Sequence, residues 1–390
     1  MLKRLNLEIT VLFYYWRREY IQVFRNVEAL VFFVLLPLAY PILYALIYNP
    51  EEVTDVPVAV VDNSRSRLSR EIVHNFDATP AAQVIGCCAN IDEAKSLMMQ
   101  RACYAVLVIP EEIDKKLLRN EQGILLFYTD MSLLLNYKSL YMALTDVTLD
   151  MGATMRLRTL PIGVSSSITD IATQPIPYTS IVMYNPTSGV ASFLIPAVLV
   201  LILQQSIVLG IAVLAATRHE QARRWYAPHH IVAQLCGRTL CYLSIYIFNT
   251  IYLLHYLPYI FGYPQMGDVI DILLLSLPMI LSSVFMASML SVWVREREHV
   301  YLAFVFTSVI FIFLSGIAWP RYAMPLVWRF MSYMVPSTWG IEGFVQINTM
   351  GATLAQASRA YIALWLLTMV YGILAVLTLH YECRKSKYKL

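Results

Sequence analysis

The sequence predicts a polytopic α-helical membrane protein with six transmembrane helices and an extracytoplasmic α/β domain inserted between the first and second spans. Hydrophobic residues make up 58% of the 390 residues and charged residues only 14%, whereas about 25% of an ordinary soluble domain is charged. The apolar residues fall in blocks of about 20, the length that a helix needs to cross roughly 30 Å of hydrocarbon. A long polar segment follows the first block and predicts a folded domain outside the membrane.

Residues 1–26 are expected to form an amphipathic helix that lies in the membrane interface. Apolar residues recur there at three- and four-residue spacing: Leu5, Ile9, Leu12, Phe13, Trp16, Tyr20, Val23 and Phe24. Basic residues such as Arg17 and Arg18 dominate the other face, which also holds Glu19. A helix on a soluble core is disfavoured because a membrane span follows directly. The segment lacks the cleavage site of a secretory signal peptide, so the first span is expected to remain as an anchor.

The first span is expected at 27–48, and the other five lie within 190–381, at 190–217, 231–257, 269–294, 300–319 and 360–381. Short connections on one side of the membrane carry most of the basic residues: Lys3, Arg4, Arg17, Arg18, Arg25, Arg218, Arg223, Arg224, Arg295, Arg297, Arg384, Lys385, Lys387 and Lys389. Because cytoplasmic connections are enriched in Lys and Arg, both termini are predicted to be cytoplasmic, including the basic tail 382–390. The expected location is the inner (plasma) membrane.

Residues 49–189 are then placed outside the cell membrane as an α/β domain. Strand-like runs alternate there with helix-like stretches, at 56–61, 83–87, 104–109 and 124–128. The helices between them begin at plausible caps such as Ser66 and Asp92. This alternation predicts parallel strands joined by crossovers, followed by a longer helix from 132 to about 160.

The cysteines of this domain are not expected to pair. If the strands beside Cys88 and Cys103 are parallel, the two residues lie at opposite ends of the sheet, on the order of 15 Å apart. A disulfide tolerates Cα separations up to about 7 Å, so this bridge is disfavoured. A metal-binding or redox role for Cys87 and Cys88 is also disfavoured, because no companion His or Cys stands at ligand spacing.

Several classes of function lack their motifs in this sequence. There is no GxxxxGK[ST] phosphate loop, no HExxH or GxSxG motif and no paired-carboxylate site, so no catalytic residue, cofactor or metal is assigned to this chain. The formal net charge of +3 is too small to indicate nucleic-acid binding. No charged residue lies near the middle of a span, which argues against an ion relay.

The connection at 217–230 is the first candidate for contact with a partner. Its charged and aromatic side chains are Arg218, His219, Glu220, Arg223, Arg224 and Trp225. The segment is typical of a solvated, positive-inside loop. It also suits a docking element, since Arg and Trp are enriched in interface hot spots. A second candidate comprises Arg295, Glu296, Arg297 and Glu298, whose alternating signs could equally form a self-neutralised turn.

Four polar residues within the spans are costly to expose to lipid: Gln204, Gln205, Asn249 and Ser282. They are therefore expected to face neighbouring helices or a cavity. Hydrogen bonds between helices are favoured over contact with a substrate, because polar groups of this kind commonly join helix pairs in membranes.

The chain resembles the type-2 ABC transporter permeases, in particular the subfamily with a large outer domain after the first span. The strongest stretch, LSGIAWPRYAMPLVWRFMSYMVPSTWGIEGF at 314–344, is similar to that family's C-terminal signature. The matching positions are Gly316, Pro320, Met324, Pro325, Ser332, Pro336, Gly343 and Phe344. Supporting matches are VPVAVVDNSRSRLSR from Val56, AVLVIP ending at Pro110, and YNPTSG from Tyr184. The resemblance covers essentially the whole chain.

This resemblance implies roles for particular residues. Arg218 and Glu220 resemble the charged motif that heads the family's coupling helix, whereas Ala222 and Arg223 stand where a Gly-Thr pair is usual and His219 replaces a charged neighbour. The stretch at 319–340 resembles the family's re-entrant helices, for which protein or a water cavity must cover the broken backbone.

The resemblance also implies a function and its partners. It implies a permease of an ATP-driven exporter for an amphipathic, drug-like or lipid-like substrate. Two cytoplasmic ATPases would carry ATP and Mg, and a second permease, identical or related, would complete the membrane part. A periplasmic adaptor and membrane lipid are further candidate partners, and nucleic acid is not. A sodium exporter is an alternative that the lack of mid-span carboxylates disfavours, and a non-transporting scaffold that recruits a periplasmic adaptor is another.

Overall fold

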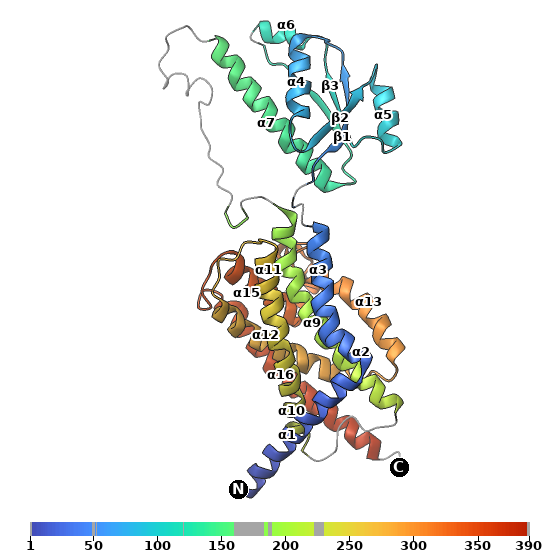
Figure 1. The fold of residues 1–390 in the computed structure, drawn as a ribbon, viewed down its shortest axis with the longest axis vertical. Helices are drawn as coiled ribbons and strands as arrows, with labels where there is room; N and C mark the ends of the chain where they lie inside the picture. Colours follow the sequence, from blue (N-terminus) through green and yellow to red (C-terminus); the bar gives the residue numbers. More distant parts are fainter. Residues whose placement is uncertain are drawn as a thin grey trace. The chain divides into compact units, whose positions relative to one another are not determined.

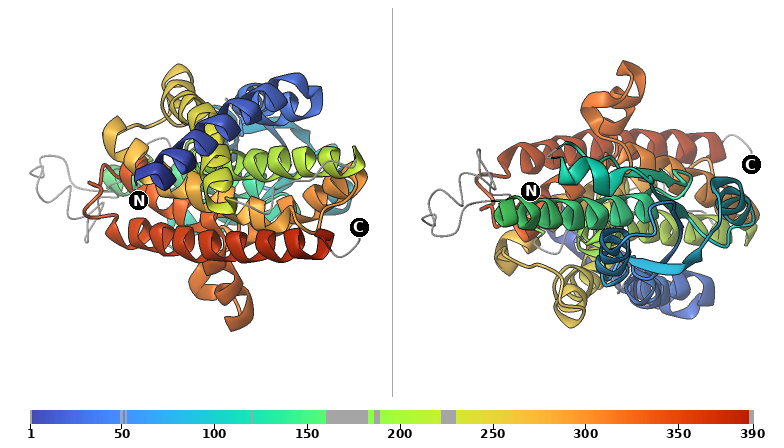
Figure 2. Two further views of the ribbon diagram at one scale, coloured as in Figure 1. Left: turned by 90° about the horizontal axis from the view of Figure 1, so that it is seen from below. Right: turned by 90° about the horizontal axis from the view of Figure 1, so that it is seen from above.

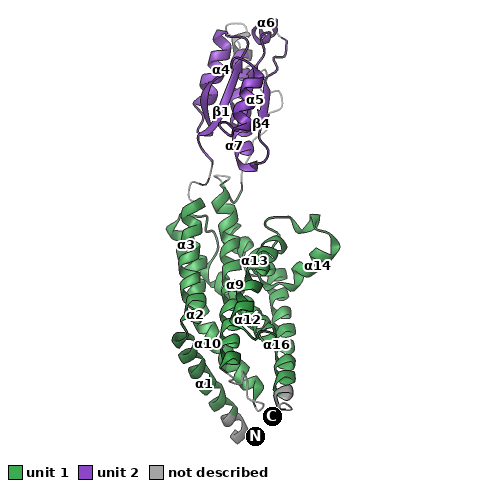
Figure 3. Cartoon of the chain, turned by 90° about the vertical axis from the view of Figure 1, so that its right-hand side faces the viewer, with its two compact units in different colours: residues 1–51, 182–390 green, residues 52–181 purple. Residues whose placement is uncertain are grey.

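The computed structural model describes residues 2–48, 51, 53–119, 121–159, 183–185, 189–221 and 230–387. The chain forms two compact units, which Figure 3 colours separately. Met1–Glu51 and Val182–Leu390 form the membrane-helix unit, and Glu52–Ile181 form the α/β unit. The amphipathic segment and the six predicted spans thus belong to one unit, while the strands belong to the other.

The membrane-helix unit begins with the long helix α1 (Leu2–Arg25), after which Asn26 starts the first span (Figure 1). Six helical segments in the described residues are long and apolar enough to cross a membrane: Val27–Tyr48, Val190–Glu220, Ile231–Ile260, Val269–Leu290, Arg297–Leu314 and Ser358–Cys383. These match the six predicted spans to within a few residues at each end. The chain is therefore a multi-pass membrane protein.

Two of these spans contain short π-helical turns. The first comprises α2 (Val27–Leu30), the π-helical turn η1 (Val31–Leu35) and α3 (Leu36–Tyr48). The third comprises α10 (Ile231–Ile251), the π-helical turn η2 (Tyr252–Tyr256) and α11 (Leu257–Ile260). The remaining helices of the unit are α9 (Val190–Glu220), α12 (Val269–Leu290), α13 (Arg297–Leu314), α14 (Leu326–Met334), α15 (Pro336–Phe344) and α16 (Ser358–Lys387), with the short turns η3 (Arg321–Ala323) and η4 (Val345–Thr349).

The break in the first span has an identifiable chemical cause. Pro37 has no N–H to donate to the carbonyl of Phe33, its helical partner four residues earlier. The side-chain amide of Asn249 donates a hydrogen bond of 2.8 Å to that carbonyl instead. The hydroxyl of Tyr252 donates to the carbonyl of Leu38 at 3.1 Å. Backbone polar groups at membrane depth need such partners, so the third span completes the hydrogen bonding of the first.

Helix α9 is the central helix of the membrane-helix unit. Its most apolar window is 89% buried, whereas that of α13 is only 11% buried. Helices α3, α12, α13 and α15 pack against α9. Seen from the two ends in Figure 2, α14 and its neighbouring residues project from one side of the unit. Helix α14 exposes most of its large apolar side chains, among them Leu326 and Phe330.

The proline-rich stretch at 319–340 forms short helical pieces rather than a continuous helix. Pro325 stands directly before α14, and Pro336 is the first residue of α15. Gly316 adopts a φ of +88°, a conformation that favours glycine, at the turn after α13. The buried Gly343 of α15 packs tightly beside Leu275 of α12. The signature residues therefore set the chain breaks and one close helix contact.

The α/β unit contains a four-stranded sheet in the order β2-β1-β3-β4. The strands alternate with helices as β1 (Val56–Asp62), α4 (Arg67–Asp77), β2 (Ala82–Cys87), α5 (Ile91–Met99), β3 (Ala105–Ile109), α6 (Ile113–Leu118), β4 (Leu126–Thr129) and α7 (Leu134–Thr159). Helices α4 and α7 share one apolar cluster with the sheet, and α5 shares a second cluster. The sheet is therefore covered by helices on both faces.

Two details of this unit differ from the sequence prediction. Strand β4 runs antiparallel to β3, so the expectation of parallel strands is wrong for β4. Helix α6 has six residues and spans only about 9 Å, too short to carry the chain back along a five-residue strand of about 17 Å. Ser66 caps α4 as predicted, but Asn90 rather than Asp92 caps α5, because the Asn90 side chain accepts the Glu93 N–H at 2.8 Å.

The cysteines of the α/β unit lie as the sequence predicts. Cys87, Cys88 and Cys103 are free thiols. Cys88 follows β2, whose Cys87 pairs with Val60 of β1, whereas Cys103 precedes β3, whose Ala105 pairs with Val58 of β1. The two residues therefore lie toward opposite ends of the parallel strands, although both contribute to the apolar cluster beneath α5. Burial is the main cause that raises the pKa of both thiols above the ordinary value. Thiols in apolar surroundings of this kind are poorly reactive, because the thiolate is the reactive form.

Candidate functional site

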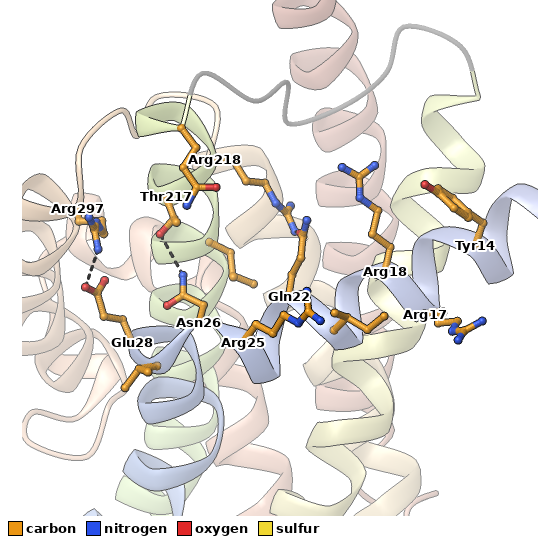
Figure 4. Close-up of a pocket in the computed structure, with 14 residues that line it drawn as sticks. Tyr14, Arg17, Arg18, Gln22, Arg25, Asn26, Glu28, Thr217, Arg218 and Arg297 are labelled. Carbon is orange, nitrogen blue, oxygen red and sulfur yellow. Dashed lines mark hydrogen bonds and ion pairs between the residues drawn. The ribbon is translucent and has the colours of Figure 1, made fainter.

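Charged side chains gather where α1, the last turn of α9 and the first turn of α13 meet (Figure 4). Helix α9 contributes Arg218 and Glu220, and α13 contributes Arg297. Asn26, at the bend between α1 and the first span, donates a hydrogen bond of 3.2 Å to the Thr217 hydroxyl. The two candidate partner-contact segments, far apart in the sequence, therefore meet at one end of the membrane-helix unit.

The buried part of this region is centred on Glu19, whose side chain is 1% exposed. Nη2 of Arg218 lies 2.7 Å from Glu19 Oε2, and Nε of Arg238 lies 3.4 Å from the same atom. The Tyr242 hydroxyl donates to Glu19 Oε1, and Arg218 also donates to the side-chain oxygen of Gln22. We call Glu19, Arg218, Arg238 and Tyr242 the buried charge cluster. It joins α1 to α9 and α10.

The charge state of Glu19 follows from its surroundings. Burial by itself raises the pKa of Glu19, but the charges of Arg218 and Arg238 and the hydrogen bonds from Tyr242 and Arg218 lower it below the ordinary value. The carboxylate is therefore ionised at neutral pH. Removing one member of a buried ion pair leaves the other charge uncompensated, which costs about 3 to 5 kcal/mol. The buried charge cluster thus holds α1 firmly against the spans.

The exposed part of the region is a chain of ion pairs on the same side. Glu220 Oε2 lies 2.7 Å from Nη2 of Arg297, and the Arg297 backbone N–H donates to Glu220 Oε1 at 3.1 Å. Nη1 of Arg297 lies 2.7 Å from Glu28 Oε1, and the Tyr301 hydroxyl donates to Glu28 Oε2 at 3.0 Å. We call Glu28, Glu220, Arg297 and Tyr301 the surface ion-pair chain. It links α2, α9 and α13.

A cavity of about 760 Å³ opens between α1 and the end of α9. We call it the α1 pocket. Its lining residues come from α1, α2, α9 and α13 and the residues joining them: Tyr14, Arg17, Arg18, Ile21, Gln22, Arg25, Asn26, Val27, Glu28, Leu214, Thr217, Arg218, Gln221 and Arg297. Five of these fourteen residues are arginines and one is a carboxylate. The pocket is therefore strongly basic, and it borders both groups of ion pairs.

The structure places the predicted partner-contact residues in different surroundings. His219 and Glu220 are exposed, but Arg218 is buried. Arg223, Arg224 and Trp225 lie outside the described residues. Arg295, Glu296 and Glu298 are exposed, and Glu296 pairs with His299 at 3.3 Å. Arg297 pairs with two distant carboxylates rather than with its neighbours, so the interpretation as a self-neutralised turn is wrong for this residue.

Three charged residues of this region were missed by the sequence analysis. Glu19 was placed on the polar face of α1, whereas its side chain is buried against α9 and α10. Glu28 and Arg238 were not singled out at all. Arg238 is the eighth residue of the third span, which starts at Ile231, and a charge inside an apolar segment is a signal for a buried partner. That signal could have identified the cluster.

The four polar residues within the spans take part in packing. Gln204 Oε1 accepts the Ser337 N–H at 2.5 Å, so this side chain caps α15. Asn249 bonds the first span, as described above. Gln205 is buried, and the Ser282 hydroxyl donates to the Met279 carbonyl of its own helix at 2.9 Å. Gln204 and Asn249 therefore connect separate helices, whereas Ser282 does not.

The interfacial residues of α1 are divided between two surroundings. Trp16 packs against the core of the unit and makes an edge-to-face contact with Tyr20, at 5.6 Å between ring centroids. Arg17 and Arg18 are exposed and line the α1 pocket. Helix α1 therefore has one face packed on the spans and another that carries basic side chains away from them.

Comparisons with known proteins address the family of the chain. A sequence model described as ABC-2 family transporter protein matches residues 28–377. A search of the curated proteins finds no match. The matched region runs from the first span to the last and includes the α/β unit, both ion-pair groups except Glu19, and the broken helices α14 and α15. The chain therefore belongs to the ABC-2 family of transporter proteins.

Proposed function

We propose that this permease exports an amphipathic, drug-like or lipid-like substrate, and that its ATPase partner acts through the surface ion-pair chain and the buried charge cluster. The family is the membrane component of ABC transporters, without an ATPase domain of its own, so a separate ATPase is implied. The observation that carries the proposal is the link from Glu220 through Arg297 to Glu28, which ties three helices together where α9 ends.

In this mechanism the ATPase presses on the connection after α9. The surface ion-pair chain passes the displacement to α13, because Arg297 is held at both Glu220 and Glu28. The buried charge cluster passes it to α1 and α10. Separating the charges of a buried ion pair is costly, so these helices move as one group. Movement of α9, the central helix, would then rearrange the helices packed on it.

The proposal includes an arrangement in the membrane and a second subunit. Both termini and the ion-pair groups face the cytoplasm of the inner membrane, in keeping with the Lys and Arg excess in those connections. The α/β unit lies on the other side, where an adaptor could bind. The largely exposed apolar face of α13, which includes Val305, Phe306 and Val309, packs against a second permease, identical or related.

Purified permease alone is expected to hydrolyse no ATP, because it lacks a phosphate loop. Hydrolysis should appear when its ATPase subunit is added to the reconstituted protein. The measurement is phosphate release from proteoliposomes that contain the permease alone, the ATPase alone or both. Hydrolysis by a preparation shown to contain only this chain would contradict the assignment as a separate membrane subunit.

Glu220 and Arg297 are expected to act as one unit in coupling. Glu220→Gln, Arg297→Gln and the double variant should reduce permease-stimulated ATP hydrolysis to a similar extent, because each breaks the same contact. An exposed pair contributes only about 0 to 1 kcal/mol to stability, so yield and membrane insertion should not change. Glu298→Gln, which removes a nearby exposed carboxylate outside the ion-pair chain, is the matched control.

The same set of variants distinguishes a direct contact with the ATPase. If Glu220 binds a basic residue of the ATPase instead, Glu220→Gln alone should weaken capture of the ATPase and Arg297→Gln should not. If the ATPase hydrolyses ATP equally fast with all three variants and with the native permease, the ion-pair chain has no role in coupling.

A further inference from the structure

The α1 pocket contains positive charge that the two ion-pair groups do not use. Arg218 and Arg297 belong to those groups, whereas Arg17, Arg18 and Arg25 make no ion pair among the described residues. Arg18 lies over the ring of Tyr15, 5.9 Å from its centroid, which leaves its charge unneutralised. The three side chains are exposed and line the wall that α1 contributes to the pocket. Such a wall favours an anion.

The carboxylate in the pocket does not neutralise these arginines. Glu28 is bound to Arg297 at 2.7 Å and to the Tyr301 hydroxyl. Figure 4 shows Glu28 turned toward Arg297, while Arg17 and Arg18 extend from α1 further along the pocket. An occupant with two or more anionic oxygens could therefore contact several arginines without meeting an unpaired carboxylate, and arginine suits phosphate because its planar fork binds two oxygens.

Apolar side chains stand beside the arginines on the exposed face of α1. Tyr14 is 59% and Ile21 44% exposed, and both line the pocket. Phe13 and Phe24 are exposed on the same helix. An exposed mixture of arginines with aromatic and aliphatic side chains is typical of a helix at the boundary between headgroups and acyl chains. A soluble acidic partner would not require these apolar groups.

The position and size of the cavity fit the same occupant. Its walls include Leu214, Thr217 and Arg218, in the last turns of the second span, so the pocket lies at one end of that span. Its volume of about 760 Å³ lies within the ~300 to 1,000 Å³ range of small-molecule sites. Basic pockets beside transmembrane helices commonly bind anionic lipid headgroups.

We propose that the α1 pocket binds the phosphate headgroup of an anionic glycerophospholipid, with its acyl chains beside the exposed apolar residues of α1. The phosphate oxygens contact Arg17, Arg18 and Arg25. The bound lipid adds to the contact between α1 and α9 that the buried charge cluster makes. It is a fixed component of the permease rather than its cargo.

The test uses delipidated, purified full-length permease in detergent, titrated with phosphatidylglycerol or phosphatidylcholine. Native mass spectrometry measures the retained lipid, and thermal unfolding measures the stabilisation that binding confers. We expect phosphatidylglycerol, but not phosphatidylcholine, to be retained and to raise the melting temperature. Arg17→Gln and Arg25→Gln should each weaken retention about fivefold, which converts to about 1 kcal/mol for each basic residue.

The matched control is Arg295→Gln, which removes an exposed arginine at the same end of the spans but outside the pocket. It should retain phosphatidylglycerol as the native chain does. The proposal would be overturned if all variants retained phosphatidylglycerol equally well, or if the native chain retained phosphatidylcholine as well as phosphatidylglycerol. Displacement of the lipid by inorganic phosphate alone would instead indicate a site for free phosphate.

One further outcome would also overturn the proposal. If the pocket variants retain lipid normally but fail to capture the ATPase, the pocket docks an acidic segment of that protein. Lipid binding is measured without the ATPase, so this inference can fail while the proposed coupling function stands, and the reverse also holds.

Discussion

Replacing Glu19 with glutamine is expected to lower the free energy of unfolding of the membrane-helix unit by about 3 to 5 kcal/mol. The substitution keeps the shape of the side chain but removes the buried negative charge that both Arg218 and Arg238 meet. Both arginine side chains are less than a tenth exposed. The loss of stability is measured by thermal unfolding of the purified protein in detergent, with size-exclusion chromatography to detect how much folded protein remains.

Glu28→Gln is the matched control, because its partner Arg297 is about 39% exposed and the pair should contribute only about 0 to 1 kcal/mol. The pH dependence gives a second check. The lowered pKa of Glu19 means that its contribution is present at neutral pH and is lost as the pH falls through that value. The difference in melting temperature between the native protein and Glu19→Gln should therefore become smaller at acidic pH. Equal melting temperatures for Glu19→Gln and Glu28→Gln at neutral pH would contradict the role of the buried cluster.

Gly237→Ala is expected to force α1 away from α10. A Cβ at this position would overlap the carbonyl oxygen of Leu12 and lie 3.2 Å from the backbone nitrogen of Trp16. Backbone atoms cannot rotate aside as a flexible side chain can, so the two helices must separate. Overpacking of this kind costs about 1 to 3 kcal/mol. The measurements are the melting temperature and the rate of tryptic cleavage at the exposed Arg17 and Arg18.

Gly372→Ala provides the control for this substitution. Gly372 also lies within a span, but a Cβ there would meet Phe285 at an ordinary distance of 3.4 Å. We expect its melting temperature and cleavage rate to match those of the native protein. Unchanged cleavage of α1 in Gly237→Ala would show that the close approach of the two backbones does not position this helix.

Much of the architecture could be predicted because hydropathy is a local property. A span needs about 20 apolar residues in one stretch, and each of the six stretches is visible without knowledge of its neighbours. The four strands are visible for the same reason. The direction of β4 could not be predicted from its own residues, because it depends on the length of α6 and on where that helix ends.

The candidate site was only partly predictable because its contacts join distant parts of the chain. Charge density identified Arg218, Glu220 and Arg297, but their partners lie far away in sequence, and Glu19 and Arg218 are 199 positions apart. The periodic spacing of apolar residues placed Glu19 on the polar face of α1. Such a prediction assumes that the face opposite the apolar one meets water. Here the spans cover part of that face, and a carboxylate is stable there because two arginines meet it.

The hydrogen bond from Asn249 to the Phe33 carbonyl has a consequence for biosynthesis. The two residues are 216 positions apart, so at a synthesis rate of about 5 to 20 residues per second the first span waits roughly 10 to 40 s for its partner. During that interval its broken backbone and the charge of Glu19 are both without their final contacts. The backbone hydrogen bonding of the first span can therefore be completed only after the third span has been synthesised.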